Sequence, residues 1–166
     1  MTDFTNNPEG FVSDVIRPVL TALGLDQDVS GATELLLGTA LQESGLAHRV
    51  QLGGGPARGL FQMEPNTHDD IWANFLRFRA PLAEKVGKFL DGNRPNSQFL
   101  TNNDLYAAAM TRILYLRMGQ LWERRRSPNG AIFPVWRPIG RNTITLSRAQ
   151  GPPLSSLPTG KASMAQ

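Results

Sequence analysis

Apolar residues recur at helical spacing through the N-terminal part of the chain, and the clearest period runs from Asn7 to Leu23. Apolar side chains return there every three or four positions, as one face of an α-helix requires. In this helix Asn7 matches an N-cap and Pro8 matches the first helical position. Gly24 lies just past the last apolar residue, where a left-handed residue commonly ends a helix. Pro18 predicts a kink or a split inside this helix, because proline lacks an N–H and its ring crowds the preceding turn.

A second apolar stripe predicts a leucine-rich helix that opens with Ser30 as its N-cap and ends at Gly45. Residues 45–58 follow, with three successive glycines and a proline. These residues exclude a long regular element, so we expect a glycine-rich loop or a small hairpin. Beyond the loop, Pro65 opens a third helix and Pro81 a fourth.

The fifth predicted helix contains the smallest side chains of the pattern. Asn103 matches its N-cap, and three successive alanines, Ala107, Ala108 and Ala109, allow other helices to approach closely. We therefore expect this helix to lie at the centre of the domain. Five helices without a clear strand pattern predict a mainly α fold.

The character of the chain changes after residue 122. Six of the 12 prolines follow Arg126, and no helical period continues. Residues 1–123 hold 10 basic and 14 acidic residues, whereas residues 124–166 hold seven basic residues and no acidic one. We therefore predict a helical domain over residues 1–122 and an irregular, basic, Pro- and Gly-rich extension over residues 123–166. Short strands are expected at 131–135 and 142–146, and a flexible tail at 150–166.

The composition argues against several kinds of site. Without cysteine there is no disulfide, no thiolate metal site and no cysteine nucleophile. The N-terminus lacks the pattern of a secretory signal peptide, and no apolar run has the length of a membrane span. The three glycines at 53–55 lack the Lys-Ser/Thr pair of a nucleotide loop, and His48 and His68 lack a zinc-binding spacing. We therefore expect neither a metal nor a cofactor.

Glu43 is the candidate for acid–base chemistry. It lies at the end of the leucine-rich second helix and precedes the glycine-rich loop. Apolar neighbours and the negative end of the helix dipole both disfavour a charged carboxylate at this position. Both effects raise the pKa of Glu43, as a proton donor for glycosidic bond cleavage requires. The alternative interpretation is a solvated surface residue at a helix end.

The residues after Glu43 resemble a known family. The pair Glu43-Ser44, the glycine-rich loop, the segment Gly59-Leu60-Phe61-Gln62 and the helix start Pro65-x-Thr67 follow one another in this order. This order and spacing resemble the lytic transglycosylase branch of the lysozyme-like superfamily, in particular its small phage-encoded members. The resemblance implies a helical domain like that of goose-type lysozyme and lytic transglycosylases, acting on peptidoglycan glycan strands.

The resemblance also implies roles for single residues. Glu43 would protonate the oxygen between the muramic acid and glucosamine units and then act as a base while the sugar's C6 hydroxyl attacks. Ser44 would hold the N-acetyl group or a water, Gln62 would line the glycan site, and the backbone of Gly59 would let the sugar come close. The residue types alone leave other roles open, with Ser44 as a cap of its helix end and Gln62 as a tie between loop and domain.

Two further site residues bear on the reaction. Glu64, with Asp69 and Asp70 as other candidates, would supply the second carboxylate that activates water in a hydrolytic lysozyme. Tyr106 matches the family tyrosine that approaches the acid, with a core residue as the alternative. The family segment Ala-Tyr-Asn-Ala-Gly is here Leu-Tyr-Ala-Ala-Ala, without the Asn and the Gly, and this departure favours a scaffold that does not cleave.

Three functions are consistent with these patterns. The first is a peptidoglycan-cleaving lytic transglycosylase or lysozyme, phage-encoded for wall penetration or lysis. In the absence of a signal peptide, it is expected in the virion or in the host cytoplasm before it reaches the periplasmic wall. The second is a non-catalytic glycan-binding or virion structural protein, whose partners include other virion proteins. The third is a protein that binds nucleic acid or another anionic partner through Arg124, Arg125 and Arg126.

Overall fold

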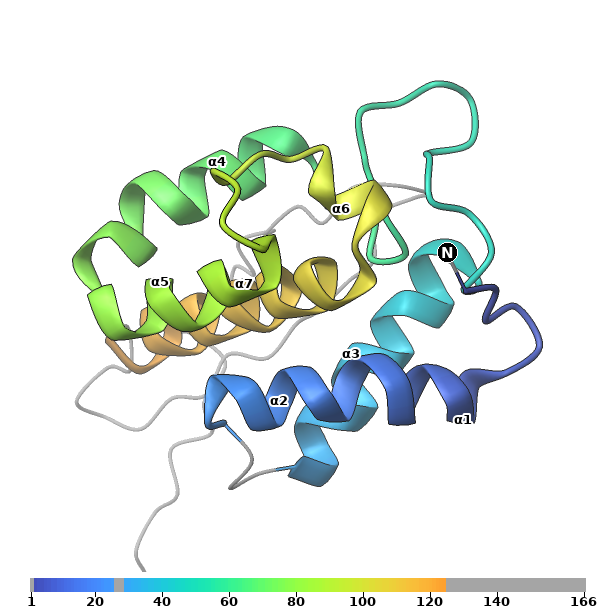
Figure 1. Cartoon of the computed structure of the whole chain (residues 1–166), viewed down its shortest axis with the longest axis horizontal. Helices are drawn as coiled ribbons and strands as arrows, with labels where there is room; N and C mark the ends of the chain where they lie inside the picture. Colours follow the sequence, from blue (N-terminus) through green and yellow to red (C-terminus); the bar gives the residue numbers. More distant parts are fainter. Residues whose placement is uncertain (1, 26–28, 125–166) are drawn as a thin grey trace, which may run out of the picture. The chain divides into compact units, whose positions relative to one another are not determined.

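The computed structural model describes residues 2–25 and 29–124, which belong to one compact unit spanning Met1–Arg125 (Figure 1). Every regular element in these residues is helical, so the mainly α class is confirmed. None of the described helices is long and apolar enough to cross a membrane. The strands expected at 131–135 and 142–146, the tail at 150–166, and Arg125 and Arg126 lie outside the described residues.

The N-terminal helical run begins and ends where its capping residues predict. Helix α1 (Pro8–Phe11) is capped by the side chain of Asn7, which accepts a hydrogen bond of 2.8 Å from the backbone N–H of Gly10. Helix α2 (Arg17–Leu23) ends at Gly24, which has a φ of +67°. The N–H of Gly24 bonds back to the last turn of the helix, so the left-handed stop is confirmed.

The interruption predicted at Pro18 takes the form of a wider helical turn. A π-helical segment, Val12–Ile16, joins α1 to α2 and ends two residues before Pro18. Pro18 has no N–H to donate to the carbonyl of Asp14, and in a regular α-helix its ring would crowd that carbonyl, so a wider turn directly before the proline relieves the conflict. The run therefore stays continuous and keeps Phe11, Val15 and Ile16 in the core.

Helix α3 (Val29–Ser44) is the predicted leucine-rich helix, and it buries Ala32, Leu36 and Ala40. Because it begins at Val29, Ser30 lies in its first turn, and the expectation that Ser30 is the N-cap is wrong. The end is as predicted. Gly45 follows the last helical residue with a φ of +59°, and Leu46 is left-handed as well.

The next helices are short. Helix α4 (Pro65–Asn74) begins at the predicted proline, and α5 (Ala80–Gly87) has Pro81 in its first turn; a 3-10 turn follows each. Helix α6 (Phe99–Asn102) falls in a segment whose sequence is polar and turn-rich. Its one fully buried side chain is Leu100, so no apolar period could have revealed it.

Helix α7 (Asp104–Arg124) lies at the centre of the unit, as its alanines predict. Every residue from Tyr106 to Thr111 is buried, and a helix buried on all sides must be surrounded by others. It contacts each of the helices α2 to α6, and Figure 1 shows it running between α2 and α5.

Residues 45–64 form the loop between α3 and α4. The hairpin considered for this loop is reduced to two isolated antiparallel bridges, Val50 with Arg58 and Arg58 with Met63. Left-handed backbone occurs repeatedly along the loop, at Gly45, Leu46, Gly53, Gly54, Gly59 and Gln62. The chain therefore turns back on itself and returns to the end of α3.

Candidate functional site

Glu43 lies in the last turn of α3, next to the start of the loop. Its side chain is half-buried, and burial raises the pKa of Glu43 above the ordinary value for a glutamate. The cause is desolvation, because removal of water penalises the charged form of the carboxyl group. The side chain therefore has the property that the sequence predicts for a proton donor.

Tyr115 and Thr39 lie beside Glu43. Thr39 precedes Glu43 by four residues, so both lie on one face of α3. The hydroxyl of Thr39 donates to the carbonyl of Leu35 at 2.7 Å, and the Tyr115 hydroxyl lies 2.8 Å from the same Thr39 oxygen. Since a threonine hydroxyl has one hydrogen, Tyr115 is the donor in the second bond. Burial, and after it the charge of Glu43, raises the pKa of Tyr115, so the two groups are close enough to interact electrostatically.

Sequence reasoning missed Tyr115 and selected Tyr106 instead. Tyr115 follows Tyr106 by nine residues, which is about two and a half turns of helix, so the two side chains leave α7 on opposite sides. Helical spacing alone could have shown that only one of them faces Glu43. It could not show which one, because that depends on how α7 packs between its neighbours.

Tyr106 belongs to the core on the α4 side of α7. It is completely buried, and its hydroxyl accepts a hydrogen bond from Nε1 of Trp72 at 2.8 Å and lies 2.7 Å from Nε2 of His68. His68 is also buried, and its Nδ1 lies 2.7 Å from Asp69. Burial raises the pKa of Tyr106 strongly. The expected role of Tyr106 beside the acid is therefore replaced by a structural one, because its hydroxyl is enclosed by two partners from α4.

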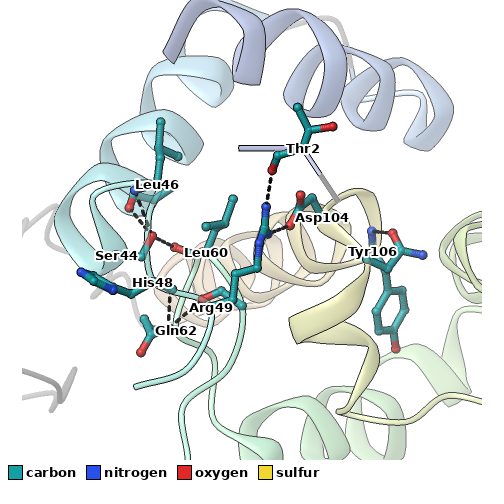
Figure 2. A network of polar contacts seen from close by, with 12 residues as sticks. Thr2, Ser44, Leu46, His48, Arg49, Leu60, Gln62, Asp104 and Tyr106 are labelled. Atoms are coloured by element: carbon teal, nitrogen blue, oxygen red, sulfur yellow. Dashed lines mark hydrogen bonds and ion pairs between the residues drawn. The ribbon is translucent and has the colours of Figure 1, made fainter. Parts of the chain in front are cut away.

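Ser44 faces the protein interior. Its buried hydroxyl lies 2.7 Å from the carbonyl of Leu60 and 3.0 Å from that of Ala40, and it accepts a hydrogen bond from the N–H of Leu46 (Figure 2). These partners use the hydroxyl as both donor and acceptor. Ser44 therefore ties the Gly59–Gln62 segment to the end of α3, and this replaces the expected contact with the sugar's N-acetyl group.

Gly59 is required by packing inside the protein. Its φ is +72°, and an added Cβ would lie 2.0 Å from the carbonyl oxygen of Leu100 at α6. Because Gly59 is buried, the close approach that requires a glycine here is to the backbone of Leu100, and the approach of a sugar stays a prediction.

Gln62 closes the same turn. Its Nε2 donates to the carbonyl of Gly59 at 2.8 Å and to that of His48 at 3.2 Å (Figure 2). The side chain therefore ties the two ends of the loop together, which is the alternative that the residue types left open. It stays partly exposed, so a contact between its side-chain carbonyl and a ligand remains compatible with this role.

The candidate second carboxylates differ in their surroundings. Glu64 is partly buried at the N-cap of α4, where its backbone carbonyl, and not its side chain, bonds to the helix. Asp69 is engaged by His68. Hydrogen bonds from Asn74 and then from Arg117 lower the pKa of Asp70. Of the three, only Glu64 is neither paired with His68 nor bonded to Asn74 and Arg117, and it follows Gln62 by two residues.

The geometry thus gathers Glu43, Thr39 and Tyr115 at the junction of α3 and α7, with Ser44 and Gln62 holding the adjoining loop. Within residues 2–25 and 29–124, no group of three histidine or acidic side chains could hold a metal ion. A scan against protein-family models and searches of curated proteins and of solved structures found no match. The resemblance to lytic transglycosylases therefore stays a prediction from the motifs.

Proposed function

We propose that this protein cleaves peptidoglycan glycan strands between N-acetylmuramic acid and N-acetylglucosamine, with Glu43 as the proton donor. The observation that carries the proposal is the place of Glu43, half-buried at the end of α3 near Thr39 and Tyr115, where burial raises the pKa of its carboxyl group. The order of Glu43-Ser44, Gly59-Leu60-Phe61-Gln62 and Pro65 supports it. The resemblance to small phage-encoded relatives suggests action in wall penetration or lysis.

The chemistry needs one carboxyl group. The protonated carboxyl of Glu43 gives its proton to the bridging oxygen as the C1–O bond of the muramic acid unit breaks, and the bonding electrons leave with the glucosamine. The C6 hydroxyl of the same muramic acid then closes onto C1 and returns its proton to the Glu43 carboxylate. Tyr115, whose hydroxyl lies beside Thr39 near Glu43, would bound the space in which the acid works.

A hydrolytic reaction would differ in the second step. Water would replace the C6 hydroxyl, and a second carboxylate would take its proton. Glu64 is the candidate for that role, because it lies on the segment that returns to α3. Mass spectrometry of digested peptidoglycan separates the two reactions, since an anhydro end is lighter than a hydrolysed end by one water.

The decisive experiment compares Glu43→Gln with Glu34→Gln on purified peptidoglycan. Both residues lie on α3, but Glu34 is exposed. We expect Glu43→Gln to lower the rate of product release by at least about 100-fold, the usual contribution of general acid catalysis, while Glu34→Gln stays at the wild-type rate. Circular dichroism must show both variants folded. Wild-type turnover by folded Glu43→Gln would refute the assignment of the acid.

A glycan-binding protein without turnover is the second candidate. The observation that favours it is that Ser44, Gly59 and Tyr106 are all occupied within the protein, so fewer groups remain for catalysis. This candidate predicts saturable binding of soluble glycan strands and no new ends in the mass spectrum after prolonged incubation.

A further inference from the structure

Arg49 joins three separate parts of the described unit. Its guanidinium forms an ion pair with Asp104 on the first turn of α7, and its other terminal nitrogen donates to the carbonyl of Thr2 at 2.8 Å. Its own backbone carbonyl accepts a hydrogen bond from the N–H of Gly59 at 2.8 Å. Figure 2 shows Arg49 reaching from the loop to both Thr2 and Asp104. One residue thus links the N-terminal segment, both limbs of the loop and the central helix.

The ion pair is shielded from solvent. The side chains of Arg49 and Asp104 are exposed by only 15% and 12%. Loss of one partner of a shielded pair leaves an uncompensated charge, so such a contact resists opening more than a surface pair does. The planar guanidinium also bonds two acceptors at once, which a lysine ammonium on its flexible stem does less well. Asp104 is favoured further by its place at the N-terminus of α7.

The loop depends on contacts of this kind. Residues 45–64 contain no strand, and their backbone is left-handed at six positions. Segments with few regular hydrogen bonds open locally at low free energy unless other contacts hold them. The Ser44 hydroxyl holds Leu60 from the side of α3, and Arg49 holds the loop from the side of α7.

We propose that Arg49 and Asp104 are positioning residues, which hold the loop of residues 45–64 in place beside Glu43. The inference rests on the function proposed above, because it gives the loop its role as one wall of the glycan site. Neither residue is a catalytic residue. The pair acts through the loop, whose Gly59–Gln62 segment is bonded to the residue next to Glu43.

The test uses Arg49→Lys and Asp104→Asn in the full chain, with Arg17→Lys, an exposed residue of α2, as the matched control. Backbone amide exchange is followed by NMR at Gly59 and Met63 in the loop and at Leu20 in α2. We expect both variants to speed exchange in the loop by about tenfold or more and to leave α2 within about twofold. For soluble glycan strands we expect KM to rise by about fivefold or more, with kcat within about twofold. The control Arg17→Lys should change neither amide exchange in the loop nor the KM.

The outcomes separate the inference from the proposed function. The double variant should be no worse than either single variant, because both remove the same contact. Equal acceleration in the loop and in α2 would show that the pair supports only global stability, and unchanged exchange in the loop or an unchanged KM would also overturn the inference. If the wild-type protein cleaves no glycan, the proposed function fails, while loop exchange and the KD for glycan strands still decide whether the pair positions the loop for binding.

Discussion

Glu43 works against stability when it is ionised. Because its pKa is raised in the folded chain, the folded chain holds this proton more tightly than the unfolded chain does. The stabilisation that comes from this tighter proton binding is fully present below the unfolded pKa of about 4.3. It is lost as the pH rises through the pKa of Glu43 in the folded chain. Groups whose pKa is perturbed by burial occur often at functional sites, which agrees with the role proposed for Glu43.

The direction of this pKa shift predicts how the stability of Glu43→Gln depends on pH. At pH 7 we expect the variant to have a higher free energy of unfolding than the wild type, because the amide carries no charge to desolvate. The gain should shrink towards zero at a pH of about 3.5, where the wild-type carboxyl is protonated in both states. Urea unfolding at the two pH values measures the difference. An equal gain at both pH values would contradict the role of ionisation.

Gly59 gives a second prediction at the scale of single residues. Gly59→Ala adds a Cβ that overlaps the Leu100 carbonyl at a left-handed position, and both effects oppose folding. We expect a loss of about 2–4 kcal/mol in the free energy of unfolding. Gly38→Ala is the matched control, because Gly38 is exposed within α3 and its added Cβ meets nothing within 4 Å. That change should stabilise the protein by about 0.5–1 kcal/mol. A Gly59→Ala variant as stable as the wild type would contradict the packing described.

At the scale of elements, α4 and α7 are joined by a buried polar network. The hydroxyl of Tyr106 is the shared partner of Trp72 Nε1 and His68 Nε2, and both of these come from α4. The indole can only donate, so the hydroxyl is free to donate its own hydrogen to His68. This arrangement fits a His68 whose Nδ1–H donates to Asp69. The network thereby sets how α4 lies against α7.

Removal of the shared hydroxyl tests this network. Tyr106→Phe leaves two nitrogen atoms without their partner in the core, and we expect it to lower the free energy of unfolding by about 2–3 kcal/mol. Tyr115→Phe is the comparison, because it removes a hydroxyl from a less buried site on the opposite side of α7. Its loss should be about 1 kcal/mol. Chemical denaturation measures the free energy of unfolding of both variants. Equal losses would show that the Tyr106 network stabilises the fold no more than the single hydrogen bond of Tyr115 does.

At the scale of the whole molecule, the described residues 2–25 and 29–124 contain a hydrophobic core of their own. Its buried apolar residues run from Phe4 to Ile113 and form one cluster around α7. Helix α7 continues to Arg124, two residues past the predicted boundary at residue 122, and the rest of the predicted basic extension lies outside the described residues. The charge contrast between the two parts is a property of the sequence itself.

The sequence by itself determined most helices, several of their ends and the position of Glu43 at the end of α3. The period of Phe11 to Leu23, the Asn7 cap and the Gly24 stop each depend on residues within a turn or two, so the local chain contains the information. The place of Glu43 was predicted in the same way, from a leucine-rich helix that ends at a glycine-rich loop, and its role as a proton donor stays a prediction.

Only the tertiary structure decided what surrounds Glu43. Ser44 with Leu60, Gly59 with Leu100 and Arg49 with Asp104 are contacts between residues far apart in the sequence. Packing also decided that Tyr115 and not Tyr106 lies beside Glu43. Helical spacing places each side chain on one face of its own helix, but the neighbour of that face is set by how the helices pack, which no local pattern records.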